Sequence, residues 1–221
     1  SQKTMGEVLS EVLGSDAAER LAFLSGPTFA IEVGRGLPAA VTVAARSESV
    51  ARRVQEALST PNFRIYTSRD IVGVQIGGAV KNVIAIAAGI SDGLELGANS
   101  RAALITRGLA EMTRLAVRMG GEPLTLSGLA GLGDLVLTCT GDLSRNRKVG
   151  VEIGRGHKIG EILAGMRMIA EGVRNTGTVF RLANRLHVEM PIVEQMQLVI
   201  SDGKDPMAAV RDLMQRSLKA E

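Results

Sequence analysis

One stretch of the chain, from Ile71 to Ser91, limits the possible folds more than any other feature of the sequence. It is apolar or small almost throughout, and Lys81, near its middle, is its only charged residue before Asp92. The stretch is long enough to cross a bilayer, but a lysine at the centre of a membrane helix costs about 2.5 to 3.5 kcal/mol. No flank of basic residues accompanies it either. The pattern therefore predicts a buried core helix.

A lysine inside such a helix needs an explanation, because burial disfavours a charged ammonium group. A buried lysine tuned toward neutrality can act as a general acid or base. A lysine that reaches solvent along its own stem, or forms a salt bridge, explains Lys81 equally well. Asn82 adds a donor and an acceptor on a neighbouring face of the same helix.

A second group of interest, GLAGLGD at residues 128–134, ends in a lone carboxylate within an apolar run. Its glycines let the backbone approach a ligand or another helix, and Asp134 could pair with Lys81 or accept a hydrogen bond from a substrate hydroxyl. The alternative is that Asp134 only caps a helix. The glycines do not match G-x-G-x-x-G and no strand precedes them, so a pyrophosphate site is expected elsewhere.

A basic segment, SRNRK at residues 144–148, follows. If Ser144 is a helix N-cap, the helix-terminal amides and the guanidinium of Arg145 point toward one place, which suits a phosphate. The alternative is a solvated basic turn. Cys139 lacks a nearby activating group and is expected to be structural, and His157 and His187 show no metal-ligand spacing, so we expect no metal site.

The charge balance argues against a nucleic-acid partner and fits a small anionic ligand better. Lys and Arg number 26 against 23 Asp and Glu, and aromatic residues make up only 2% of the chain. A single cysteine excludes an internal disulfide, and no secretory signal pattern opens the sequence, which favours the cytoplasm. The opening residue, Ser1, leads into a helix-like stretch without a start methionine, and this suggests a truncated chain.

The pattern of apolar residues predicts a short α/β part followed by helices. Strands are expected at residues 21–24, 39–45 and 63–67, with a turn at 25–28 and a helix capped by Ser47 that ends near Leu58. From Asp70 onward apolar residues recur at helical spacing. Helices are expected from an Asn99 cap to Gly120, from Val173 to Leu186, and from Pro191 and Pro206, the latter behind Asp205.

Taken in order, six segments resemble the bacterial-type NAD(P)-dependent glycerol-3-phosphate dehydrogenases over nearly the whole chain. They are SGPTFA (25–30), GGAVKNVIAI (77–86), NSRAALITRGLAEM (99–112), GLAGLGDLVLTCT (128–140), SRNRK (144–148) and EGVRNT (171–176). The resemblance implies a mainly α fold. Residues 1–69 would be the C-terminal remnant of a Rossmann-type dinucleotide-binding α/β domain, and residues 70–221 an all-α substrate-binding and catalytic domain. The family's glycine-rich loop and a further substrate-contacting lysine would precede Ser1.

The resemblance also implies roles for individual residues. Lys81 would be the catalytic acid/base, with the substrate also contacted by Gly26, Thr28, Asn82, Asp134, Thr138, Ser144, Arg145 and Asn146. The nucleotide, NAD or NADP, would be contacted by Ala30, Arg145, Ile169 and Glu171. The implied reaction is hydride transfer between a nicotinamide and glycerol 3-phosphate or dihydroxyacetone phosphate, supplying glycerol 3-phosphate for phospholipid synthesis. A homodimer without a membrane span is expected, and a truncated chain would be inactive alone.

Two other functions remain open on the sequence. A related two-domain reductase acting on another small substrate would keep Lys81 and Asn82 without needing a phosphate site, so competition by phosphate at Arg145 separates the two cases. A non-catalytic helical assembly module would explain the apolar helices but not a buried lysine near a glycine-rich aspartate loop. An exposed Lys81 would favour that module.

Overall fold

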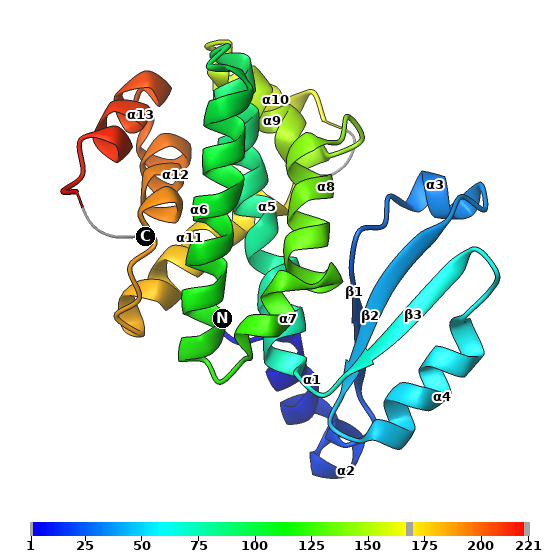
Figure 1. Cartoon of the computed structure of the whole chain (residues 1–221). Helices are drawn as coiled ribbons and strands as arrows, with labels where there is room; N and C mark the ends of the chain where they lie inside the picture. The colour runs from blue at the N-terminus through cyan, green and yellow to red at the C-terminus, as the bar shows by residue number, and fades with distance from the viewer. Residues whose placement is uncertain (1, 167–169, 219–221) are drawn as a thin grey trace.

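The structure is a computed structural model that describes residues 2–166 and 170–218. A three-stranded sheet lies beside a bundle of helices (Figure 1). The first part contains α1 (Met5–Leu13), α2 (Ser15–Ala18), β1 (Ala22–Ser25), α3 (Ala30–Gly34), β2 (Ala39–Ala45), α4 (Glu48–Leu58) and β3 (Phe63–Ser68). The bundle contains α5 (Ile71–Gly93), α6 (Gly97–Arg118), α7 (Pro123–Ser127), the π-helix η1 (Leu129–Gly133), α8 (Asp134–Thr140), α9 (Arg145–Gly154), α10 (Ile159–Ala164), α11 (Glu171–Arg185), α12 (Pro191–Asp202) and α13 (Pro206–Met214).

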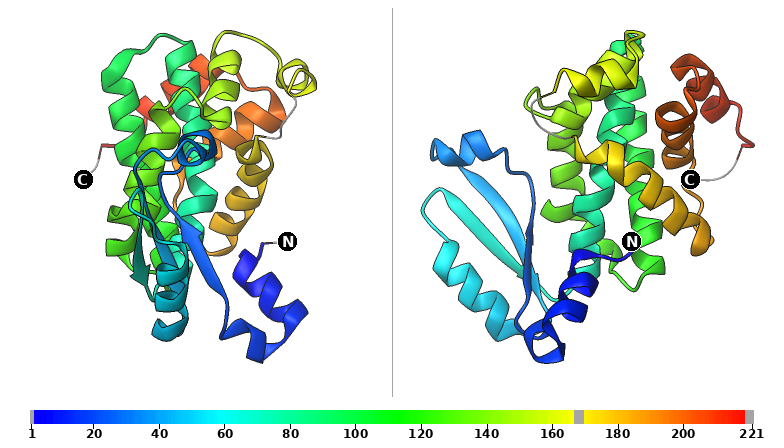
Figure 2. Two further views of the ribbon diagram at one scale, coloured as in Figure 1. Left: turned by 90° about the vertical axis from the view of Figure 1, so that its right-hand side faces the viewer. Right: turned by 180° about the vertical axis from the view of Figure 1, so that it is seen from behind.

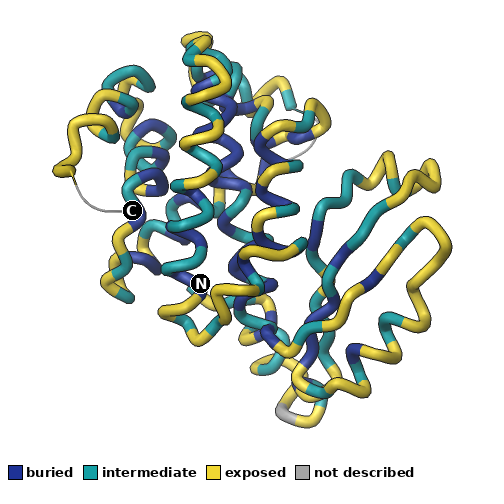
Figure 3. The backbone as a smooth tube through the Cα atoms, in the orientation of Figure 1, coloured by how far each residue is buried: buried dark blue, intermediate teal, exposed yellow. Residues whose placement is uncertain are grey.

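The sheet has the order β1-β2-β3, with β1 antiparallel to β2 and β2 parallel to β3. Val41 and Val43 of β2 and Ile65 of β3 pack with Ala51 of α4, which covers one face of the sheet. On the other face, Ala44 packs with Val74 of α5 and Ala130 of η1. Helix α4 and the strand β3 are exposed on their outer sides (Figure 3). The sheet therefore joins the bundle along the side of α5 and η1.

Helix α5 is the centre of the bundle. Its N-terminus is capped by Asp70, whose carboxylate accepts a hydrogen bond from the backbone N–H of Gly73 at 2.7 Å. The helix is long and apolar enough to cross a membrane, but 67% of its most apolar window is buried inside the protein. Helices α6, α8, α9 and α11 surround it (Figure 1). The prediction of a buried core helix is confirmed.

Helix α9 crosses α5 with the two backbones in contact, because glycines face each other at the crossing. A Cβ atom at Gly89 would lie 2.1 Å from the carbonyl oxygen of Arg147, and a Cβ atom at Gly150 would lie 2.1 Å from that of Ile86. No alanine fits at either position without displacing main chain. The sequence pattern did not predict this close crossing.

The three predicted strands are confirmed, and the strand expected at residues 39–45 has both ends as predicted. The described residues after Asp70 form no strand. Helices α12 and α13 begin at the two predicted prolines, and Asp205 caps α13 through its carboxylate. The prediction that Asn99 caps a helix was wrong. Helix α6 begins at Gly97, because Glu95 (φ 57°) and Gly97 (φ 83°) complete the reversal from α5 before Asn99 is reached. Ser47 precedes α4 as expected, but its side chain forms no capping hydrogen bond.

Candidate active site

Lys81 and Asp134 form an ion pair between α5 and the first residue of α8, and Lys81 Nζ donates to Asp134 Oδ2. The glycines make this approach possible, since a Cβ atom at Gly77 would lie 2.4 Å from the carbonyl oxygen of Ala130 in η1. The side chain of Lys81 is 19% exposed and that of Asp134 only 3%. The predicted pairing is confirmed, and the alternative that Asp134 only caps a helix is wrong.

The carboxylate of Asp134 is held from two further sides. Thr138 Oγ1 donates to the backbone carbonyl of Asp134 at 2.6 Å and lies 3.4 Å from its Oδ1, and Ser25 Oγ lies 3.5 Å from its Oδ2. Burial raises the pKa of Asp134, and the neighbouring Lys81 offsets only part of that rise. The charge on Asp134 therefore depends on the ammonium of Lys81.

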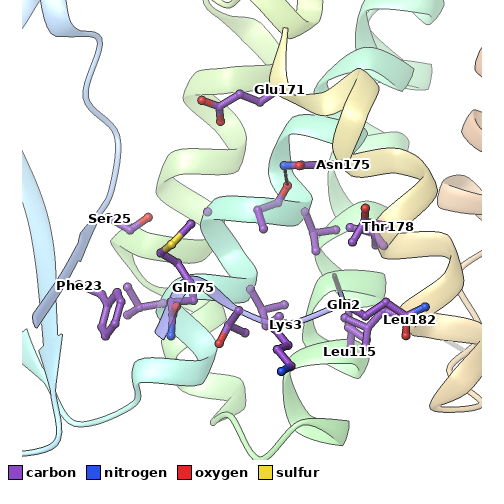
Figure 4. Close-up of a pocket in the computed structure, with 18 of the residues that line it drawn as sticks. Gln2, Lys3, Phe23, Ser25, Gln75, Leu115, Glu171, Asn175, Thr178 and Leu182 are labelled. Carbon is purple, nitrogen blue, oxygen red and sulfur yellow. Dashed lines mark hydrogen bonds between the residues drawn. The ribbon is translucent and has the colours of Figure 1, made fainter. Parts of the chain in front are cut away.

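A cavity of about 580 Å³ opens between β1, α5 and α11. Ser25, Gly78, Glu171 and Asn175 are among the residues that line it, and Figure 4 shows Ser25 on the side of β1 and Glu171 and Asn175 on the side of α11. Asn175 Nδ2 donates to the carbonyl oxygen of Ala79 at 3.4 Å. Because Ser25 both lines the cavity and contacts Asp134, the cavity adjoins the Lys81–Asp134 pair.

In the basic turn, Ser144 is the N-cap of α9, and its Oγ accepts a hydrogen bond from the N–H of Arg147 at 3.2 Å. Arg147 forms two ion pairs within the protein, with Asp92 at 2.8 Å and with Asp142 at 2.9 Å. Arg145 is exposed and has no ion-pair partner among the residues that the structure describes. Of the two arginines, Arg145 is the one available to an anionic ligand.

The loop between β1 and α3 carries two of the predicted residues, Gly26 and Thr28, and a third, Ala30, begins α3. Gly26 has φ 152°, and a Cβ atom there would lie 2.9 Å from Val41 Cα, so only glycine fits this position. Thr28 Oγ1 donates to the carbonyl oxygen of Gly26 at 3.2 Å, and Ala30 is exposed at the start of α3. The ring of Phe29 packs on Gly141, which places the loop beside the end of α8.

The two asparagines predicted for the site contact each other. Asn146 Nδ2 donates to Asn82 Oδ1 at 2.9 Å, and both residues are buried. Glu171 is exposed at the first residue of α11. Ile169 lies outside the described residues. The structure places the other predicted site residues on α5, on α8, on α9 and its N-cap, at the start of α11, and on the loop after β1 and the start of α3.

Ser25, Gly172 and Asn175 were not predicted as site residues, although all three lie within the segments SGPTFA and EGVRNT. Ser25 was treated only as part of a turn, and no pattern indicated that it reaches Asp134. Cys139 is buried, and burial raises its pKa to about 12, which agrees with a structural thiol. His157 Nδ1 lies 2.7 Å from a carboxylate oxygen of Glu152. Within the described part of the chain, no cluster of three or more His, Cys, Asp or Glu is placed to hold a metal ion.

Comparisons with known proteins agree with this arrangement. Residues 70–211 match the family model of the NAD-dependent glycerol-3-phosphate dehydrogenase C-terminus, and residues 1–51 match that of the N-terminus. The glycerol-3-phosphate dehydrogenase [NAD(P)+] of Syntrophotalea carbinolica is 63% identical over 98% of this chain, and that of Citrifermentans bemidjiense is 61% identical over 99%. The chain covers 65% of the length of each.

A solved structure gives the same result for the fold. The crystal structure of glycerol-3-phosphate dehydrogenase from Coxiella burnetii superposes with a TM-score of 0.93 at 44% identity, over 97% of this chain and 65% of that one. A structure from Dunaliella salina, at 22% identity and a TM-score of 0.86, shares the fold.

Proposed function

The chain belongs to the NAD-dependent glycerol-3-phosphate dehydrogenase family, and on that premise we propose that the protein carrying it transfers a hydride between NAD or NADP and the pair glycerol 3-phosphate and dihydroxyacetone phosphate. The observation that carries the proposal is the Lys81–Asp134 pair beside the cavity, with the exposed Arg145, which forms no ion pair with any described residue, on a neighbouring helix. The pair suits proton transfer, and the guanidinium suits a phosphate.

When bound, the nicotinamide cofactor supplies the hydride to C2 of the ketone, or accepts it from C2 of the alcohol. Lys81 transfers the proton that accompanies the hydride. In reduction, the ammonium of Lys81 gives a proton to the C2 oxygen, and the resulting neutral amine regains a proton from solvent. In oxidation, the neutral amine takes the proton of the C2 hydroxyl. Asp134 stabilises the ammonium form, and Thr138 holds Asp134 in place.

The substrate phosphate would be bound by Arg145 together with the amides at the start of α9, which Ser144 caps. Arginine suits this role because its planar donors can contact two phosphate oxygens at once. Gly26 and Thr28 would contact the substrate from the loop after β1. The alternative, a reductase of another small substrate, does not require a phosphate-binding arginine at the capped start of α9.

The residues present fit a nicotinamide cofactor. Gly78 lets Ser25 approach α5 closely, since a Cβ atom there would lie 3.2 Å from Ser25 Oγ, and the cavity volume lies in the range typical of small-molecule sites. Glu171 and Ala30, both exposed, would contact the nucleotide together with Arg145. A contact of Ile169 with the nucleotide remains a prediction.

The alternative of a helical assembly module conflicts with the position of Lys81, which is largely buried against Asp134.

We further propose that the protein acts in the cytoplasm as a homodimer and supplies glycerol 3-phosphate for phospholipid synthesis. The outer edge of β3, which pairs with no other strand among the described residues, supports association. Sedimentation analysis over a range of concentrations tests the homodimer, and a monomer at every concentration would contradict it.

The function is tested by following NAD(P)H oxidation with dihydroxyacetone phosphate and, in parallel, with dihydroxyacetone. We expect turnover with the phosphorylated ketone and a much higher KM without the phosphate. Inorganic phosphate should compete with the substrate, and Arg145→Ala should weaken that competition. The exposed Arg155, which pairs with Glu152, gives the matched control Arg155→Ala. Absence of turnover with either ketone and either nucleotide, in the protein that carries this chain and not in the chain alone, would refute the proposal.

A further inference from the structure

We propose that Arg147 and Asp92 are positioning residues, which hold the first turn of α9 in the orientation that binds the substrate phosphate. The inference rests on the proposed function, in which Arg145 and the amides of that turn contact the phosphate. Arg147 and Asp92 act through the helix and need not touch the substrate. Their ion pair, which joins Arg147 Nε to Asp92 Oδ2 at 2.8 Å, connects α9 to the C-terminal end of α5.

The first turn of α9 has backbone donors that are free to bind a ligand. The N–H of Arg147 is used by the cap, because it donates to Ser144 Oγ at 3.2 Å. The N–H groups of Arg145 and Asn146 donate to no described residue. A phosphate bound at these groups depends on the direction of the first turn, since a change in that direction misaligns the amides and the Arg145 guanidinium together.

Arg147 is held against α5 at two points. Its carbonyl oxygen lies against the backbone of α5, where a Cβ atom at Gly89 would be 2.1 Å away. Its guanidinium pairs with Asp92, three residues further along α5. The main-chain contact sets how close the two helices lie, and the ion pair resists rotation of α9 about its own axis. The right-hand view of Figure 2 shows α9, in yellow-green, lying against this end of α5.

Asp92 is a firm anchor because a third helix also holds it. Arg101 of α6 donates from Nη1 to Asp92 Oδ1 at 2.7 Å, while Arg147 donates to Oδ2. The side chains of Asp92 and Arg147 are 13% and 17% exposed, so salt screens this pair less than a surface pair. The other partner of Arg147, Asp142, has a side chain that is 94% exposed and lies in the loop before Ser144. We therefore expect Asp142 to contribute little to the positioning.

The sign of one substitution separates positioning from charge. Asp92→Asn removes a negative charge beside the start of α9, and Coulomb's law alone predicts that the phosphate then binds more tightly. Loss of positioning predicts weaker binding, because Arg147 keeps only its exposed partner Asp142. Asp142→Asn removes the same charge from the same arginine, so it is the matched control.

The test uses the protein that carries this chain, with dihydroxyacetone phosphate and dihydroxyacetone as alternative substrates. In Asp92→Asn we expect the ratio of kcat/KM for the phosphorylated ketone to that for the unphosphorylated one to fall about fivefold to tenfold. Inhibition by inorganic phosphate should weaken by a similar factor. A merely structural role would reduce the amount of folded enzyme, which lowers both kcat/KM values equally and leaves their ratio unchanged. Asp142→Asn should keep the ratio within about twofold.

A second variant, Arg147→Lys, tests the proposal even if Asp92→Asn does not fold. It conserves the charge but places a methylene group where Nε donates to Asp92, so the ratio should fall about threefold or more. An unchanged or higher ratio in either folded variant, or an equal fall in Asp142→Asn, would overturn the positioning role. Absence of turnover by the parent protein with dihydroxyacetone phosphate would instead refute the proposed function.

Discussion

A buried glutamate that has no role in the proposed site should make the stability of this fold depend on pH. Glu111 of α6 is 1% exposed, and its carboxylate accepts hydrogen bonds from the backbone N–H groups of Ile192 at 2.7 Å and Val193 at 3.2 Å. These amides begin α12. Burial raises the pKa of Glu111 from 4.5 to about 7, although the two amides, Arg114 and Arg216 all lower it.

The raised pKa of Glu111 sets the direction in which stability changes with pH. The folded protein holds the proton of Glu111 more tightly than the unfolded chain does, so its contribution to stability is fully present below pH 4.5 and is lost as the pH rises through about 7. The difference between 4.5 and about 7 corresponds to roughly 3 kcal/mol, at about 1.4 kcal/mol for each pKa unit.

Glu111→Gln removes the titration and keeps one oxygen for the amides of α12. The assay is urea unfolding of both proteins at several values between pH 4.5 and pH 8. The free energy of unfolding of the parent protein should fall, relative to that of Glu111→Gln, by about 3 kcal/mol from the acidic to the alkaline end of that range. The exposed Glu56 of α4 gives the control Glu56→Gln. Parallel stability curves for the parent and Glu111→Gln would show that the buried carboxyl group does not titrate as inferred.

Three further predictions concern the site and its support. Lys81→Ala should lower kcat by about 10² to 10⁴ with nucleotide affinity nearly unchanged, because the amine acts on the proton, and a loss below tenfold would contradict that role. Arg145→Lys should raise the KM for dihydroxyacetone phosphate despite keeping the charge, since an ammonium cannot bind two phosphate oxygens side by side; an unchanged KM would show that Arg145 is only a surface residue. Gly150→Ala should destabilise the protein by about 1 to 3 kcal/mol or more in thermal or urea unfolding, whereas Gly160→Ala, with open space around it, should not.

Much of the fold could be predicted because its signals are local. The β2 strand is a run of β-branched and small residues with clear ends, and the lone Lys81 in an apolar stretch indicated both a buried helix and a need for a partner. The start of α6 could not be predicted, because it depends on the positive φ of Glu95, a conformation that a glutamate does not indicate in the sequence.

The parts of the site that the sequence did not predict depend on distant segments. Ser25 approaches Asp134 only because the sheet packs on α5 and η1, and the amide of Asn146 is oriented by groups from two other helices. Glu111 reads as an ordinary polar residue of an amphipathic helix, and only the docking of α12 buries it. Such contacts arise from tertiary packing, so residue spacing alone does not reveal them.

The glycine crossing of α5 and α9 has a consequence for substrate length. Lys81 and Arg145 lie on helices whose backbones contact each other at Gly89 and Gly150, so side-chain changes at the crossing cannot alter the spacing of the two helices. Helices separated by side chains can slide to fit ligands of different size, but these two are held at one spacing. A phosphorylated ketone with one carbon more between carbonyl and phosphate should therefore be rejected rather than accommodated. Main-chain geometry would then contribute to the discrimination between homologous substrates, together with the side chains of Lys81 and Arg145.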